Sequence, residues 1–152
     1  MKESKLFKAS WMIYAVGTII GMIVSGVAIV TPLFIEGIFE SYVGQPWIEF
    51  TQREPRLASL FQHLSRLEAC DYFLGCVFAL FIVFAAYRKS RRWAWLVLVI
   101  TTVLGAGEFV AFGSIFSDPV GIAMGILTLC VGLIPLLLPI KEIWGAKTIQ
   151  AG

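Results

Sequence analysis

Long runs of apolar residues, separated by short polar segments, dominate the hydrophobic pattern of the chain. The four runs cover residues 11–35, 67–87, 93–116 and 120–140. Each is close to the ~20 apolar residues that a helix needs to cross a bilayer. The sequence therefore predicts an all-α fold, an integral membrane four-helix bundle in which residues 1–152 form a single four-span transmembrane domain.

The largest polar segment, between the first and second runs, predicts an outer amphipathic helix. Upstream of it, Gly44-Gln45-Pro46 predicts a break, and Trp47 and Phe50 are interpreted as anchors at the membrane interface. Pro55 suits the first turn of a helix. From there apolar residues recur with helical spacing at Leu57, Leu60, Phe61, Leu64 and Leu67. We expect this helix to continue unbroken into the second span.

Prolines and small residues indicate where the spans end and how they pack. Pro32 is expected to kink or end the first helix. Asp118 and Pro119 are expected at the N-cap and the first turn of the fourth helix. Small residues four apart let helices approach closely, so two faces are predicted to bind neighbouring helices or partner subunits: Gly17/Gly21/Ser25 and Gly121/Gly125.

The composition supports a membrane location. Hydrophobic residues make up 59% of the chain and charged residues 14%, whereas soluble domains have about 25% charged residues. The formal net charge of +2 gives no indication of a nucleic-acid partner. The first apolar run is too long for a cleaved signal peptide, so we interpret it as a retained helix. Cys70, Cys76 and Cys130 form no CxxC pair and are interpreted as free thiols.

The distribution of charge predicts the orientation. Nine of the twelve cations lie in the amino-terminal segment, the turn at 88–92 and the carboxyl-terminal tail: Lys2, Lys5, Lys8, Arg88, Lys89, Arg91, Arg92, Lys141 and Lys147. The positive-inside rule then predicts a multi-pass protein of the cell membrane with both termini in the cytoplasm. The cationic side suits anionic lipid headgroups.

The string Tyr87–Trp95, YRKSRRWAW, is the most distinctive segment. Physically it predicts a turn between two helices, with basic residues for lipid phosphates and with Trp93 and Trp95 at the headgroup level. It resembles the YRRGxRWAW-type turn between spans two and three of a broad set of small uncharacterised prokaryotic four-span membrane proteins. The resemblance covers about residues 55–100 and implies the fold but no activity. Arg66 loosely matches an arginine of that set, and Ser90 replaces its usual glycine.

Glu108 is the ionisable residue that most needs an explanation. It lies fifteen residues after Trp93, about 22 Å along its helix. Asp71 lies at a similar depth, but its side chain leans toward the outer water whereas that of Glu108 leans deeper. An unpaired carboxylate in hydrocarbon is costly, so Glu108 must be neutral, paired or hydrated. Arg66 and Tyr72 are the predicted partners.

Three interpretations of this region stay open. The first is a hydrogen bond or ion pair that fixes helix register, the second is an outward-opening polar pocket, and the third is a contact with a partner subunit. The predicted pocket contains Glu108, Asp71, Arg66, Glu68, Tyr72 and His63, with Glu36 as a further member. A metal site at His63 and Cys70 is disfavoured because one histidine without a second donor at i+3 or i+4 is a weak signal.

Two functions from different classes follow. The first is a non-catalytic accessory or partner-binding subunit of a membrane complex, because the sequence contains no recognisable catalytic set and predicts no cofactor. The second is a binder of a lipophilic molecule such as a quinone or sterol, or an isomerase, that uses the polar pocket around Glu108. The second resembles sterol-isomerase-like four-helix proteins in site type only. A transporter would require oligomerisation of the four spans.

Overall fold

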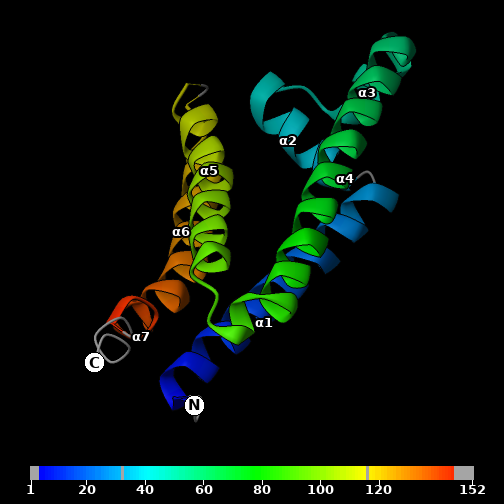
Figure 1. Cartoon of the computed structure of the whole chain (residues 1–152). Helices are drawn as coiled ribbons and strands as arrows, with labels where there is room; N and C mark the ends of the chain where they lie inside the picture. Colours follow the sequence, from blue (N-terminus) through cyan, green and yellow to red (C-terminus); the bar gives the residue numbers. More distant parts are fainter. Residues whose placement is uncertain (1–3, 32, 116, 146–152) are drawn as a thin grey trace, which may run out of the picture. The chain divides into compact units, whose positions relative to one another are not determined.

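The computed structural model describes residues 4–31, 33–115 and 117–145. Within these residues every regular element is helical, which confirms the predicted all-α fold (Figure 1). In chain order, the elements are α1 (Lys5–Val30), α2 (Leu33–Val43), α3 (Trp47–Arg53), α4 (Pro55–Ala85), the 3-10 turn η1 (Tyr87–Lys89), α5 (Arg92–Ile115), α6 (Pro119–Leu137) and α7 (Ile140–Gly145).

Three of the helical segments are long and apolar enough to cross a membrane: Lys5–Val30, Pro55–Lys89 and Arg92–Ile115. A shorter apolar helix covers Gly121–Leu137. In each of the three long segments only 17% of the most apolar stretch is buried within the chain. Apolar side chains facing outward suit a lipid environment, so the helices are compatible with a helical membrane bundle and a multi-pass protein.

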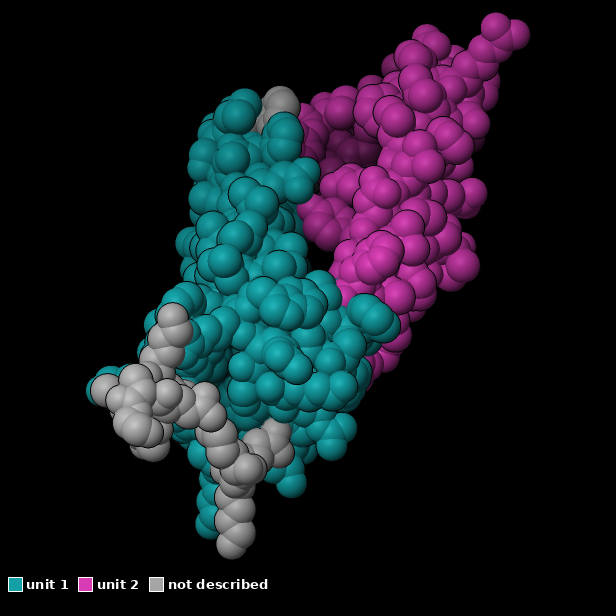
Figure 2. Space-filling view, viewed as in Figure 1, with its two compact units in different colours: residues 1–18, 79–152 teal, residues 19–78 magenta. Residues whose placement is uncertain are grey.

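The chain divides into two compact units. Unit 1 contains residues 1–18 and 79–152, and unit 2 contains residues 19–78 (Figure 2). The first half of α1 and the end of α4 therefore belong to unit 1, together with α5, α6 and α7. The remainder of α1, all of α2 and α3, and the first part of α4 form unit 2. Each unit has its own buried apolar cluster.

The helix boundaries refine the expected spans. α1 begins at Lys5, where the Ser4 hydroxyl accepts a hydrogen bond from the Phe7 N–H as an N-cap. It ends at Val30, five residues before the expected end, and a separate helix follows; Pro32 lies outside the described residues. α4 is continuous from Pro55 to Ala85, as predicted. α6 ends at Leu137 instead of residue 140.

Helices α5 and α6 form a close antiparallel hairpin in unit 1. α6 contributes glycines at the contact. A Cβ atom at Gly125 would lie 2.9 Å from the carbonyl oxygen of Ala106 and 3.0 Å from the amide nitrogen of Val110. A Cβ atom at Gly132 would overlap Cγ2 of Thr102. The two backbones can approach this closely because these positions have no side chain.

A turn with a left-handed residue joins α5 to α6. Ser117 has a φ of 56°, and the Asp118 N–H donates to the Gly113 carbonyl at 2.7 Å. This six-residue hydrogen bond is typical of a Schellman motif, in which the residue after the helix adopts the left-handed conformation. Pro119 begins α6, as predicted. The carboxylate of Asp118 lies over the first turn, because a Cβ atom at Gly121 would be 2.6 Å from its Oδ2.

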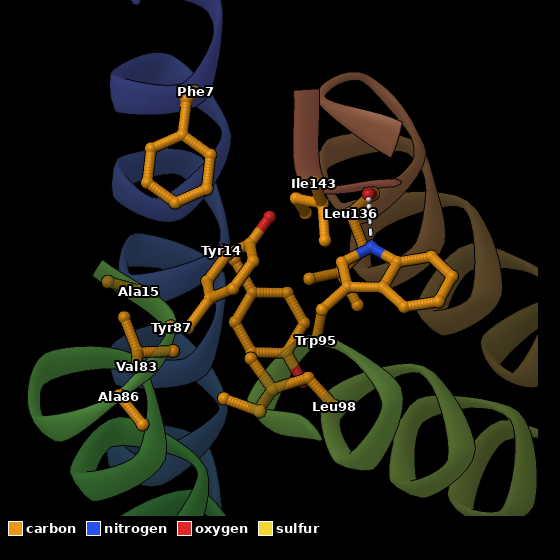
Figure 3. Packing of buried hydrophobic residues seen from close by; sticks show 11 residues of the cluster. Phe7, Tyr14, Ala15, Val83, Ala86, Tyr87, Trp95, Leu98, Leu136 and Ile143 are labelled. Atoms are coloured by element: carbon orange, nitrogen blue, oxygen red, sulfur yellow. Dashed lines mark hydrogen bonds between the residues drawn. The ribbon is translucent and has the colours of Figure 1, made fainter. Parts of the chain in front are cut away.

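The core of unit 1 brings together side chains from α1, the end of α4, η1, α5, α6 and α7 (Figure 3). Tyr87, Leu98 and Leu136 are fully buried in it. The rings of Phe7 and Tyr87 pack edge to face with their centroids 5.4 Å apart. Trp95 also lies in this core and is only 8% exposed, whereas Trp93 is 56% exposed. Trp95 therefore packs mainly inside the chain, and the headgroup level predicted for both tryptophans stays a prediction.

Unit 2 has an aromatic core between α2, α3 and α4. Phe39 packs against Trp47, Phe50 and Phe61 with centroid distances of 4.9, 4.5 and 5.9 Å. The chain reverses between α2 and α3 at Gly44, whose φ of 67° suits glycine, and the Trp47 N–H donates to Oε1 of Glu40 at 2.9 Å. Trp47 is only 5% exposed, so the prediction of an interfacial anchor is wrong for this residue. Its ring is instead buried beside Phe39.

Candidate functional site

Five of the predicted site residues lie on one helix of unit 2. His63, Arg66, Glu68 and Asp71 on α4 have exposed side chains, and Tyr72 is half-buried. Glu68 and Tyr72 each make a polar or ring interaction within the chain. Glu36, on α2, is half-buried. Most residues of the predicted pocket therefore lie on the surface of this unit.

Glu108 lies in unit 1, on the face of α5 that points away from α6. Ala106 and Val110 contact Gly125 of α6. Because a helix turns 100° per residue, Glu108 lies about 200° from each of them, on the opposite side. Its side chain is exposed. The neighbouring side chains on this face are apolar and equally uncovered, with Leu104 67% and Ile115 70% exposed.

Glu108 and its predicted partners belong to different units. Among the described residues of unit 1, no side chain donates a hydrogen bond or forms an ion pair with its carboxylate. Its pairing with Arg66 or Tyr72, and the polar pocket that would combine them with Asp71, stay predictions. Space is available beside the carboxylate, since a Cβ atom at Gly105 or Gly107 would meet nothing within 4 Å.

The described residues contain no group of three or more histidine, cysteine, aspartate and glutamate side chains suited to a metal ion. Cys70 and Cys76 are half-buried and Cys130 is exposed, and all three are free thiols.

A buried polar network in unit 1 was not predicted from the sequence. The Ser10 hydroxyl lies 2.7 Å from the Tyr87 hydroxyl and donates to the carbonyl oxygen of Pro135. In a regular helix that carbonyl would accept from residue 139, but residue 139 is a proline and has no N–H. The spacing of Pro135 and Pro139 was the available signal, because it leaves one carbonyl that needs an outside donor.

Two further backbone carbonyls, near the ends of α6 and α7, also accept hydrogen bonds from side chains. The indole N–H of Trp95 donates to the Leu136 carbonyl at 2.7 Å, as Figure 3 shows. The Nε of Arg92 donates to the Ile143 carbonyl at 2.9 Å. The last carbonyls of a helix have no hydrogen-bond donor within that helix. Here Arg92 and Trp95, at the start of α5, donate the missing hydrogen bonds. The expected polar tail after residue 140 is therefore, up to Gly145, a short helix held in place.

The string Tyr87–Trp95 is mainly a structural element. Tyr87 and Ala94 are fully buried. Ser90 is left-handed with a φ of 56°, and the hydrogen bonds Ser90 N–H to Tyr87 O and Arg91 N–H to Ala86 O form a second Schellman motif. A glycine would suit this position, because a left-handed residue without a Cβ atom is unstrained. The cations Arg88, Lys89 and Arg91 remain exposed.

The small-residue faces that were predicted to bind partner subunits pack inside the chain. Gly125 faces α5, as described above, and a Cβ atom at Gly121 would lie 3.5 Å from Cα of Gly113 on the same helix. In unit 1 a Cβ atom at Gly17 would lie 3.3 Å from Val131, and in unit 2 one at Gly21 would lie 3.3 Å from Sγ of Cys76. Ser25 is buried, and its hydroxyl donates to the Gly21 carbonyl. These positions contact other parts of the chain itself, and the binding of partner subunits through these faces stays a prediction.

Comparison with known proteins gives no identification. The chain matches no protein-family model, no curated protein and no solved structure. The functional argument therefore depends on the residues themselves.

Proposed function

We propose that the protein is a non-catalytic subunit of a membrane complex, which binds its partner through the face of α5 around Glu108. The observation that supports this is an exposed carboxyl group on an otherwise apolar helix face that α6 leaves uncovered. A charged residue at the centre of a membrane helix costs about 3 kcal/mol or more. An ionised carboxylate here therefore needs a donor from outside unit 1.

The proposed partner is a membrane helix that presents a lysine, an arginine, a histidine or another hydrogen-bond donor at the depth of Glu108. Leu104 and Ile115 would supply the apolar contact above and below the carboxylate. A charged group inside the membrane is strongly unfavourable when its partner is missing, because its charge is then not compensated. Such a contact would therefore be specific for a partner with its donor at this height.

The test is co-purification of the tagged full-length chain from its native membranes. Glu108→Gln keeps the shape of the side chain and removes the charge, so we expect the partner to be lost while the purified chain unfolds as wild type does. Thr128→Val is the matched control: this threonine is exposed on α6 and its hydroxyl bonds only the Met124 carbonyl of its own helix. The control should retain the partner.

Two results would contradict the proposal. One is a wild-type chain that always extracts alone and functions alone. The other is a loss of stability in the isolated chain when Glu108→Gln or Arg66→Gln is introduced, with no further loss when the two are combined. That non-additivity would indicate an ion pair within the chain.

The alternative function is the binding of a lipophilic small molecule, of the quinone or sterol class, against Glu108. The open space at Gly105 and Gly107 favours it. In that case Glu108→Gln would abolish ligand binding, or isomerase turnover, without changing co-purification.

The charge distribution supports a further part of the proposal, namely that both termini lie in the cytoplasm of a cell-membrane protein. Reporter domains fused to the carboxyl terminus test it. An alkaline phosphatase fusion, active only outside the cytoplasm, should be inactive, and a fluorescent protein fusion should be bright. The opposite pattern would reverse the orientation.

A further inference from the structure

An open hollow lies at the end of unit 1 where α5 begins and α7 follows α6. Its volume is about 430 Å³, and it is lined by Trp95, Ile140, Lys141 and Trp144. The rings of Trp95 and Trp144 meet edge to face, with their centroids 6.0 Å apart. The hollow is thus lined by two indoles, an isoleucine and a lysine.

One cation lines the hollow, and a second contacts the ring of Trp144. The guanidinium carbon of Arg92 lies 5.3 Å from the centre of the Trp144 ring, and its Nε donates to the Ile143 carbonyl. These contacts hold the guanidinium in position. Its two terminal Nη groups have no acceptor in the part of the chain that the structure describes. Lys141 is exposed and lines the hollow directly.

The hollow lies where apolar helices give way to charged residues. In α5 an apolar sequence begins directly after Arg92. After α6, the first charged residue is Lys141. Trp93 and Trp144 are both about half exposed at this level. Exposed tryptophans beside cations are typical of the headgroup region of a bilayer.

We propose that this hollow binds one anionic phospholipid. The first methylenes of an acyl chain would lie on Trp95, Ile140 and Trp144, and Lys141 and the free Nη groups of Arg92 would bind the phosphate. Charge-assisted hydrogen bonds from an arginine suit a phosphate, and the indole lining suits the chain. The site is separate from Glu108 and does not depend on the function proposed above.

Native mass spectrometry of the full chain, from micelles with equimolar phosphatidylglycerol and phosphatidylcholine, tests the proposal. Wild type should retain phosphatidylglycerol in preference to phosphatidylcholine. Lys141→Gln should weaken retention of phosphatidylglycerol about fivefold, the factor expected for one cation near a lipid phosphate. Trp144→Leu, which removes the ring beneath the chain, should also weaken it. Lys89→Gln removes an exposed cation outside the hollow and should have no effect.

Several outcomes would overturn the proposal. One is equal retention of the two lipids by wild type, and another is retention of phosphatidylglycerol by Lys141→Gln that equals that of wild type. A third is an equal loss of phosphatidylglycerol with Lys89→Gln, which would indicate that general surface charge binds the lipid. Millimolar inorganic phosphate added as a competitor separates the two sources of phosphate. It should leave the lipid bound, because phosphate alone makes no contact with the apolar lining. Displacement by phosphate would indicate a site for the free anion instead.

Discussion

The indole nitrogen of Trp95 donates a hydrogen bond to the backbone carbonyl of Leu136, forty-one residues later, at a distance of 2.7 Å. This contact joins the start of α5 to the end of α6. The carbonyl needs it because α6 ends at Leu137 and Pro139 interrupts the helical pattern. A tryptophan beside a cationic turn thus stabilises the fold, where its sequence context suggested a lipid anchor.

Trp95→Phe should destabilise unit 1. The substitution keeps an aromatic ring but leaves the buried Leu136 carbonyl without a donor, which costs about 1–3 kcal/mol. Unfolding by SDS in mixed micelles, followed by circular dichroism, measures the loss. Trp93→Phe is the control, since Trp93 is exposed and should change stability little. Equal effects of the two substitutions would mean that the hydrogen bond contributes nothing.

Ser10→Ala should also be destabilising, although it removes only one oxygen atom. The Ser10 hydroxyl connects the Tyr87 hydroxyl to the Pro135 carbonyl, and the side chain is fully buried. Its loss leaves both groups without this partner, and we expect a cost of about 1–3 kcal/mol in the same unfolding experiment. Ser114→Ala is the comparison, because that hydroxyl is exposed and bonds the Val110 carbonyl of its own helix. A stability equal to that of Ser114→Ala would contradict the network.

Ser90→Gly should stabilise the protein. Ser90 is held in the left-handed conformation at the end of η1, where a residue with a Cβ atom is disfavoured by roughly 1 kcal/mol relative to glycine. Ser59→Gly should instead destabilise the protein, because Ser59 is exposed in the interior of α4, where glycine costs about 0.5–1 kcal/mol. The measurement is the difference between the two midpoints of thermal unfolding. A destabilised Ser90→Gly variant would mean that the serine side chain makes a compensating contact.

The helices and most of their ends could be predicted from local signals. Pro55 and Pro119 begin α4 and α6, and Gly44 lies in the break that follows α2. These signals act within one turn of the chain and therefore need no knowledge of tertiary structure. The all-α fold follows from the length of the apolar runs.

Which side of each helix is buried could not be predicted in the same way. A tryptophan fits both a membrane interface and a core, so Trp47 and Trp95 looked like anchors, and only their partners Phe39 and Leu136 show that they are buried. α5 is apolar around its whole circumference, and its pattern does not reveal which side faces α6. The position of Glu108 along its helix could be counted from the residues, whereas its uncovered face is known only from the contact of Ala106 with Gly125.

The last prediction concerns this contact. Gly125→Ala should separate α5 from α6 locally, because the new methyl group would lie 2.9 Å from the Ala106 carbonyl oxygen and 3.0 Å from the Val110 nitrogen. Both atoms belong to the backbone, which cannot move aside as a flexible side chain would. Overpacking of this kind costs about 1–3 kcal/mol, and SDS unfolding together with cross-linking between cysteines introduced on α5 and α6 would detect it.

Gly105→Ala is the matched control for that experiment. It adds the same methyl group to the same hairpin, but at a position where a Cβ atom meets nothing within 4 Å. Because alanine has a higher helix propensity than glycine, by about 1 kcal/mol, this variant should be as stable as wild type or more stable. If both alanines are tolerated equally, the close approach of the two backbones is not required for the hairpin. If only Gly105→Ala is tolerated, the glycine at residue 125 is required by the space between the helices and not by flexibility.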